Sequence, residues 1–302
     1  MKKPIEVHKV HTFSGHKDCL YTLQPFTDRT FFSAGGDGMV VLWDLTQPEK
    51  GTMIAKVPAS IYAMYFEKES SQLIIGQNFE GIHIIDMNSR EEVGSLKFTE
   101  DAIFDIKADQ HLIYVATGGG EVIVIDRKNL SIVQRIDEGT KNARTIALND
   151  KWFVVGYSDN HIRVFEKKSL KKVKDIIAHK ISVFSLVFHP DMDVLVSGSR
   201  DAHLKFWSLP DFSLESGFAA HMYAINHIEF SPDKQHFVTC SMDKSIKVWD
   251  AQTFKLKKVI DKSRHAGHGT SVNKLLWLPH QNQLVSCSDD RTISVWNLNF
   301  GE

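Results

Sequence analysis

A pattern that recurs about every 41 residues constrains the fold of this chain more than any other feature. Four segments end in a short apolar run with a tryptophan at the same place, namely Trp43, Trp207, Trp249 and Trp296. Three further segments, between the first two of these, carry another apolar residue at the tryptophan position, namely Ile85, Ile125 and Phe165. Seven units therefore fill the chain, and we expect residues 1–302 to form a single domain without a linker.

The units have the character of β-strands. Each contains short runs of β-branched and aromatic residues, such as 183–188 and 194–199, separated by Gly, Asp, Asn and Pro. Helical periodicity is not sustained anywhere. With 302 residues, 42% of them hydrophobic, the chain can bury a core without a disulfide or a metal ion. The sequence therefore predicts an all-β protein.

Short dipeptides link the repeat to a known family. A histidine follows Gly or Ala at His16, His179, His221 and His268, and the dipeptide Trp-Asp occurs at 43–44 and 249–250. With these motifs the chain resembles the WD-repeat (transducin-like) family over residues 8–299. The resemblance implies a seven-bladed β-propeller, with four-stranded antiparallel blades around a central channel. Residues 5–13 look like a lone strand, and the last unit lacks an outermost strand, so we expect the N-terminal strand to pair with the last blade.

Four polar positions recur with nearly fixed spacing in four of the units. A Ser or Thr follows the histidine after 17 or 18 residues, an Asp comes 4 residues later, and the Trp comes 6 residues after the Asp. The four sets are His16, Ser33, Asp37, Trp43; His179, Ser197, Asp201, Trp207; His221, Thr239, Asp243, Trp249; and His268, Ser286, Asp290, Trp296. A serine hydrolase uses the same residue types, but four copies without a nucleophile turn argue for a structural role. The resemblance implies a hydrogen-bonded tetrad that ends at the indole N–H, which can only donate.

The second, third and fourth units depart from this pattern. They lack the tryptophan, and Phe79 and Gly119 stand at the Asp position of the second and third units. The fourth unit keeps Asp159 but has Val155 in place of Ser or Thr. We expect these three blades to be held by apolar packing alone and to be softer than the other four.

The resemblance also suggests where a partner binds, since family members commonly bind peptides at one end of the channel. The repeat register places one residue of each unit at the start of its innermost strand, facing the channel mouth: Tyr21, Tyr62, Phe104, Arg144, Phe184, Asn226 and Asn273. The residue before nearly all of them is apolar and expected in the core, so by alternation these seven should point away from the core. Three residues beside the turn Asp should line the same rim: Arg200, Met242 and Asp289.

The chemistry of the ligand stays open at this stage. Aromatic rings can hold an aliphatic or a cationic side chain, whereas Arg144 and Arg200 can bind a carboxylate or a phosphate. The aromatic residues also suit β-strands for reasons of propensity alone.

Charge and cysteine content limit the other possibilities. The chain has 36 Lys and Arg against 37 Asp and Glu, which gives no basis for a general nucleic-acid or membrane binder. Three widely spaced cysteines, with neither a signal peptide nor a long apolar segment, favour a reducing, cytoplasmic setting. We also expect the propeller to be a monomer. The His265–His268 run lacks further ligands at zinc spacing, so we expect no metal. The glycine-rich segments 34–38 and 118–121 fit turns and not a phosphate-binding loop, so we expect no cofactor.

Three functions are compatible with these observations. The leading hypothesis is a non-enzymatic scaffold that binds a peptide segment of a partner at the channel mouth. The second is a structural subunit that contacts a larger assembly through the blade sides of residues 55–170. The third and weakest is a propeller enzyme such as a hydrolase or lactonase, which would need several acidic or histidine side chains converging in the channel; Asp105 and Asp289 are the nearest carboxylate candidates.

Overall fold

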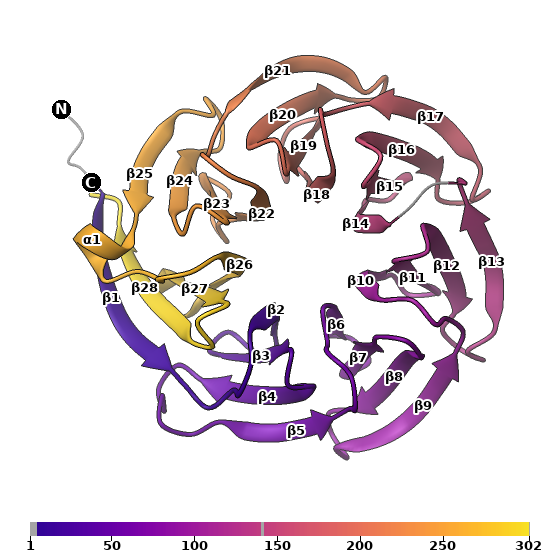
Figure 1. Cartoon of the computed structure of the whole chain (residues 1–302), viewed down its shortest axis with the longest axis horizontal. Coiled ribbons are helices and arrows are strands. Elements are labelled where there is room, and N and C mark those ends of the chain that lie inside the picture. Colours follow the sequence, from indigo (N-terminus) through magenta and orange to yellow (C-terminus); the bar gives the residue numbers. More distant parts are fainter. Residues whose placement is uncertain (1–4, 140–141, 302) are drawn as a thin grey trace.

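Seven four-stranded antiparallel sheets make up nearly all the regular structure of the chain. The computed structural model describes residues 5–139 and 142–301. Figure 1 shows the sheets standing as blades around a central axis, with the chain running once around the ring. The predicted seven-bladed β-propeller is confirmed.

Each blade has strands at four distances from the channel. The innermost strands are β2 (Leu20–Pro25), β6 (Met64–Glu67), β10 (Ile103–Ala108), β14 (Ala143–Leu148), β18 (Val183–Phe188), β22 (Ile225–Phe230) and β26 (Val272–Leu278). The second strands are β3 (Thr30–Gly35), β7 (Gln72–Gln77), β11 (Leu112–Thr117), β15 (Trp152–Tyr157), β19 (Val194–Ser199), β23 (His236–Ser241) and β27 (Gln283–Ser288). The third strands are β4 (Met39–Asp44), β8 (Gly81–Asp86), β12 (Glu121–Asp126), β16 (His161–Glu166), β20 (His203–Ser208), β24 (Ile246–Asp250) and β28 (Ile293–Asn299).

The outermost strands are β5 (Thr52–Lys56), β9 (Glu91–Lys97), β13 (Ile132–Asp137), β17 (Lys172–Ile177), β21 (Ser213–Ala219), β25 (Leu256–Ile260) and β1 (Glu6–Phe13). One short helix, α1 (Lys262–His265), and one 3-10 turn, η1 (His280–Asn282), complete the described elements. Neither is long and apolar enough to cross a membrane.

The ring is closed by the first strand of the chain. Strand β1 pairs antiparallel with β28, from Glu6 opposite Asn299 to Phe13 opposite Ile293, and the two strands lie side by side in Figure 1. Phe13 is fully buried, and its ring centroid lies 5.3 Å from that of Trp43 in the first blade. The predicted closure is confirmed, and it covers the edge that β28 would otherwise expose.

The core lies between neighbouring blades. One apolar cluster, for example, joins Val285 and Leu276 of the last blade to Leu23, Phe31 and Trp43 of the first. Since each blade is covered on both faces, its middle strands are apolar along much of their length; β19 is buried at every residue. Each blade thus depends on its two neighbours for stability.

A β-bulge opens the innermost strand of six blades, leaving one residue without a partner across the ladder. The unpaired residues are Tyr21, Phe104, Arg144, Phe184, Asn226 and Asn273. A bulge redirects the side chain that it carries, and all six line a cavity in the channel. The burial pattern agrees with the alternation that the sequence predicted, since Leu20 and Thr22, on either side of Tyr21, are both buried.

The two glycine-rich segments form tight turns. Gly38 and Gly120 have φ values of +69° and +98° between the second and third strands of their blades. Residues with a Cβ rarely adopt this conformation, which explains glycine there.

Candidate functional site

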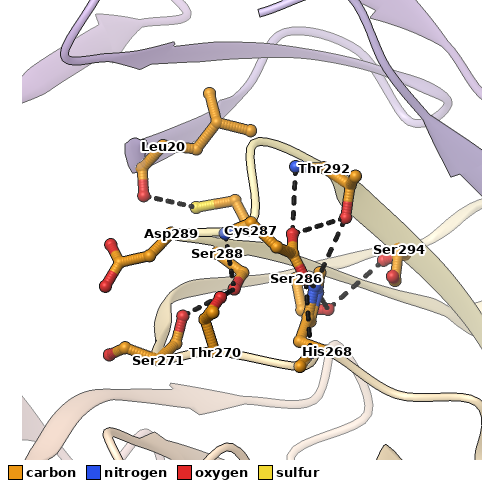
Figure 2. A network of polar contacts seen from close by, with 12 residues as sticks. Leu20, His268, Thr270, Ser271, Ser286, Cys287, Ser288, Asp289, Thr292 and Ser294 are labelled. Atoms are coloured by element: carbon orange, nitrogen blue, oxygen red, sulfur yellow. Dashed lines mark hydrogen bonds and ion pairs between the residues drawn. The ribbon is translucent and has the colours of Figure 1, made fainter. Parts of the chain in front are cut away.

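The four His–Ser/Thr–Asp–Trp sets are hydrogen-bonded chains inside their blades. In the first blade the Trp43 Nε1–H donates to Ser33 Oγ at 2.7 Å, Ser33 Oγ lies 2.8 Å from His16 Nε2, and His16 Nδ1 lies 2.9 Å from an Asp37 oxygen. Figure 2 shows the corresponding network of the last blade, where His268 lies beside Ser286. The nucleophile-like hydroxyl of each set is buried and occupied by the indole.

The direction of these bonds fixes the state of the histidines. Because the Asp37 carboxylate can only accept, the hydrogen of the neutral His16 ring lies on Nδ1, and Nε2 then accepts the O–H of Ser33, whose oxygen accepts from the indole. Burial lowers the pKa of His16, His179 and His221, which favours this neutral form. Burial is the largest influence on Asp201 and opposes its ionisation, but the hydrogen bonds from His179 and from the backbone N–H groups of Lys180 and His203 together outweigh it and hold the pKa of that carboxyl well below its usual range.

The expectation that the second to fourth blades are held by apolar packing alone is wrong. In the second blade His83 lies 3.0 Å from Gln77 Oε1 and 2.9 Å from Glu92. In the fourth blade the buried Arg163 guanidinium lies 2.7 Å from Asp159 and 3.2 Å from Asp175.

Arg163 also contacts Glu138 at 3.4 Å and lies 4.5 Å from the Tyr157 ring centroid. In the third blade Arg135 donates to Glu121 at 2.9 Å. Apart from Asp159, which keeps the tetrad position, these networks use arginine and long side chains outside the tetrad spacing, so the spacing rule could not find them.

At the channel mouth, aromatic and cationic side chains from neighbouring blades contact one another. The Tyr21 and Tyr62 ring centroids are 4.8 Å apart, and the Tyr62 and Phe104 rings stack at 5.9 Å. The Arg144 guanidinium lies 4.2 Å from the Phe104 centroid and 5.6 Å from that of Phe184, and its Nε donates to Ser158 Oγ at 2.8 Å. The aromatic faces that might have held a cation of a partner already hold Arg144.

The two asparagines of the predicted set connect blades through their amide groups. Asn226 Nδ2 donates to the Val272 carbonyl at 2.8 Å, and Asn273 Nδ2 donates to the Leu20 carbonyl at 2.8 Å and to Asp289 at 2.7 Å. The sixth blade is thereby joined to the seventh, and the seventh to the first.

All seven predicted channel-mouth residues line one cavity of about 120 Å³. Arg200, Met242 and Asp289 do not line it; Arg200 and Met242 lie exposed, and Asp289 is half-buried against Asn273. Burial lowers the pKa of Arg144, and the positive charge of Arg200 lowers it further, so two like charges lie close together here.

Sequence reasoning missed the charged residues deeper in this cavity. Lys107, His227 and Lys274 line it, each beyond the bulge of its strand. The signal was available, since polar residues interrupt otherwise apolar strands at these positions. The side chain of Asp105, also in the lining, accepts the Ile146 N–H at 2.8 Å and therefore joins two blades.

Exposed apolar side chains stand beside the mouth on the same face. Met222 and Tyr223, in the loop before β22, are 83% and 62% exposed, and Met242, in the turn after β23, is 50% exposed. They belong to one corner of the sixth blade, because the Met242 N–H donates to the carbonyl of Ala224. The sequence analysis identified only Met242.

Two of the three thiols are buried in the blades. Cys240 and Cys287 are buried, as expected for packed thiols, and burial raises the pKa of both. Within residues 5–139 and 142–301, no three His, Cys, Asp or Glu side chains are grouped so as to hold a metal ion.

A fold of seven four-stranded blades, with tetrads at the repeat spacing, defines a WD-type β-propeller. The family model described as "WD domain, G-beta repeat" matches residues 8–44, 170–208, 212–250 and 261–297, half of the chain. The chain therefore belongs to the WD40 family. The matched segments cover the four blades that have a tetrad, and the unmatched stretch 45–169 contains most of the three that lack one.

Two similar proteins illustrate the relationship. The meiotic fizzy-related protein 1 of Schizosaccharomyces pombe is 25% identical over 199 residues, which span 63% of this chain and 47% of that protein. The aligned part is thus about half the length of this relative. The crystal structure of the WD40 β-propeller domain of Doa1 superimposes with a TM-score of 0.85 over 97% of both chains at 16% identity, which shows the shared fold.

Proposed function

We propose that this chain is a non-enzymatic protein-interaction scaffold that binds an extended peptide segment of a partner across the channel mouth. WD40 propellers typically serve as such scaffolds. The observation that carries the proposal is the position of Met222, Tyr223 and Met242, exposed together beside the cavity of the channel. Exposed clusters of large apolar side chains often mark interaction sites. The proposed contact residues are these three with Tyr21, Tyr62, Phe104, Arg144, Phe184, Arg200, Asn226, Asn273 and Asp289.

The hydrogen bonds of the channel carboxylates support the proposal that this protein is not an enzyme. Asp105 and Glu229 each accept a hydrogen bond from a backbone N–H of the next blade, Ile146 and Trp277 respectively. Carboxylates engaged in joining blades are poorly placed to act as an acid–base pair on a substrate.

We extend the proposal to the whole chain: residues 1–302 act as one domain and as a monomer, in a reducing, cytoplasmic setting, with neither nucleic acid nor a membrane as ligand. The near-zero net charge supports the last point. Three free thiols support the reducing compartment.

The test is selection of random displayed peptides on the purified protein, followed by affinity measurement of the best synthetic peptides. Tyr223→Glu places a charge on the proposed apolar contact and should weaken binding at least tenfold. Leu214→Glu is the matched control, because Leu214 is 53% exposed on the outermost strand of the fifth blade. Equal loss in both variants, or none in Tyr223→Glu, would contradict binding at the channel mouth.

Truncation of the ring aromatics is a less clean test. Tyr62, Phe104 and Phe184 contact each other or Arg144, so a triple alanine variant would also disturb contacts between blades.

The second candidate, a structural subunit that binds through the second to fourth blades, is favoured by a different observation. The outermost strands of these blades expose Val93, Ile132, Val133, Val173 and Ile177. Val133→Glu combined with Val173→Glu would abolish incorporation into an assembly if this surface is the contact. Retained assembly in this variant and loss in Tyr223→Glu would favour the channel mouth.

A further inference from the structure

The cavity of the channel carries a surplus of positive charge. Three cationic side chains line it, Lys107, Arg144 and Lys274, against the carboxylate of Asp105, and the carboxyl group of Glu229 lies near the two lysines. His227, the other titratable lining group besides the tyrosines, stays neutral, because burial lowers its pKa far below the ordinary value. Such a cavity repels a lysine or arginine side chain.

Lys274 is a buried cation that is not paired at close range with any carboxylate among the described residues. Its ammonium group forms no salt bridge with any residue in 5–139 or 142–301, whereas Lys107 lies 3.8 Å from Asp105. Burial lowers the pKa of Lys274, and the positive charge of Lys107 adds to this, while Asp105 and Glu229 oppose it. A charge held away from water gains most from a partner of opposite sign.

The size of the cavity also limits its occupant. A volume of about 120 Å³ corresponds to about four water molecules, or to one short side chain. The apolar residues Met222, Tyr223 and Met242 stand on the same face, where the residues flanking such a side chain would lie.

We propose that the peptide bound at the channel mouth is anchored by one Asp or Glu side chain, whose carboxylate enters the cavity toward Arg144 and Lys274, with apolar neighbours on Met222, Tyr223 and Met242. This rests on the proposed peptide docking and adds its chemistry. The partner is thus a segment in which an acidic residue is flanked by apolar residues.

The experiment uses peptides selected from the random library on the whole protein. We expect enrichment of Asp and Glu at one position, with hydrophobic residues beside it. Replacing this acid by the matching amide should weaken binding by about ten- to hundredfold, as expected for loss of a charged hydrogen bond.

Variants of the protein assign the effect to the cavity. In Lys274→Met the preference for the acidic over the amide peptide should fall at least threefold, since the coupling with one of the two cations is gone while Arg144 remains. Lys128→Met, an exposed lysine in the turn after β12, should keep the full preference. Thermal unfolding verifies that both variants are folded.

The outcomes separate this inference from the proposed function. Peptides that bind at the channel mouth with equal affinity as acid and amide, or that are rich in Lys and Arg, overturn the carboxylate anchor and leave the docking site standing. Tighter binding of a phosphoserine than of a glutamate at the anchor position also overturns it. If no peptide is selected, or if Tyr223→Glu has no effect, both proposals fail.

Discussion

The fifth and the fourth blades provide hydrogen-bond partners for their buried polar groups in different ways. Both have four antiparallel strands and a buried core, yet the fifth holds its polar groups in the chain Trp207–Ser197–His179–Asp201, and the fourth holds its polar groups around Arg163. In the fourth blade Val155 occupies the position that Ser197 has in the fifth. Phe165 replaces the tryptophan and stacks on Phe153 with the ring centroids 4.6 Å apart. An indole at this place would need a hydrogen-bond acceptor, whereas the phenyl ring needs none. Once the indole N–H is absent, the hydroxyl and the histidine are no longer required.

The comparison teaches that the tetrad is one of several ways to satisfy buried polar groups in a blade. The hydrogen-bonded histidine of the fifth blade is kept neutral by burial, whereas the cation of the fourth is permanent. The two kinds of blade should therefore respond differently to mutation and to pH.

The largest loss of unfolding free energy is expected for Arg163→Met in the fourth blade. Its guanidinium, nearly fully buried, contacts three carboxylates, and removal of one partner from a buried ion network typically costs about 3–5 kcal/mol. Urea unfolding measures this loss. Arg135→Met, at the more exposed pair with Glu121, is the control and should cost less than about 1 kcal/mol. Similar losses in both variants would show that the network of the fourth blade is not a stability element.

The second-largest loss of unfolding free energy is expected when a tetrad loses its hydroxyl. Thr239→Val keeps the shape of the side chain but removes the hydroxyl that lies 2.7 Å from His221 Nε2 and 2.9 Å from Trp249 Nε1. Two buried groups lose their partner, so unfolding free energy should fall by about 2–3 kcal/mol.

Thr239→Ser, which retains the hydroxyl, should cost distinctly less than Thr239→Val. The reverse change, Val155→Thr in the fourth blade, should also destabilise the protein, because it buries a hydroxyl without the tetrad. A stabilising Val155→Thr would mean that the fourth blade is only a degraded tetrad blade.

A smaller difference is expected on mild acidification. The pKa values of His16, His179 and His221 are lowered by burial, so the unfolded state binds more protons than the folded state near pH 6. The stability that these histidines contribute is present above their unfolded pKa of about 6.5 and is lost as pH falls below it.

Hydrogen exchange at pH 7.5 and 5.5, corrected for intrinsic exchange rates, measures this difference. Amides of β19 and β20 should lose more protection than those of β11 and β12, whose blade lacks a tetrad histidine. Equal losses in the two blades would show that the tetrads do not govern the pH response.

The smallest effect is expected for His83→Leu in the second blade. His83 bridges Gln77 and Glu92, but the Glu92 side chain is half exposed, so the pair is worth about 0.5–1 kcal/mol at most. Chemical denaturation suffices to measure it. A loss as large as that of Thr239→Val would mean that this network stabilises the protein as much as a tetrad does.

Much of the fold followed from the repeat. The tryptophan positions and their substitutes Ile85, Ile125 and Phe165 fix seven units, and the missing last strand requires closure by residues near Phe13. The channel-mouth set was also found, because the register transfers a position from one unit to the next. Lys274 and Lys107 were not found, since their units carry different residues at the corresponding positions and no repeat marks them.

The sequence by itself determined the number of blades, the four tetrads and the residue of each unit that faces the channel, because these depend on spacing along one chain. Only the tertiary structure decided that Arg144 fills the space between Phe104 and Phe184, that Asn273 joins the last blade to the first, and that Lys274 forms no salt bridge with any of the described residues. Those contacts join residues about 40 to 250 positions apart. Side chains from different blades meet only when the ring closes, so no local pattern can encode which partner each one finds.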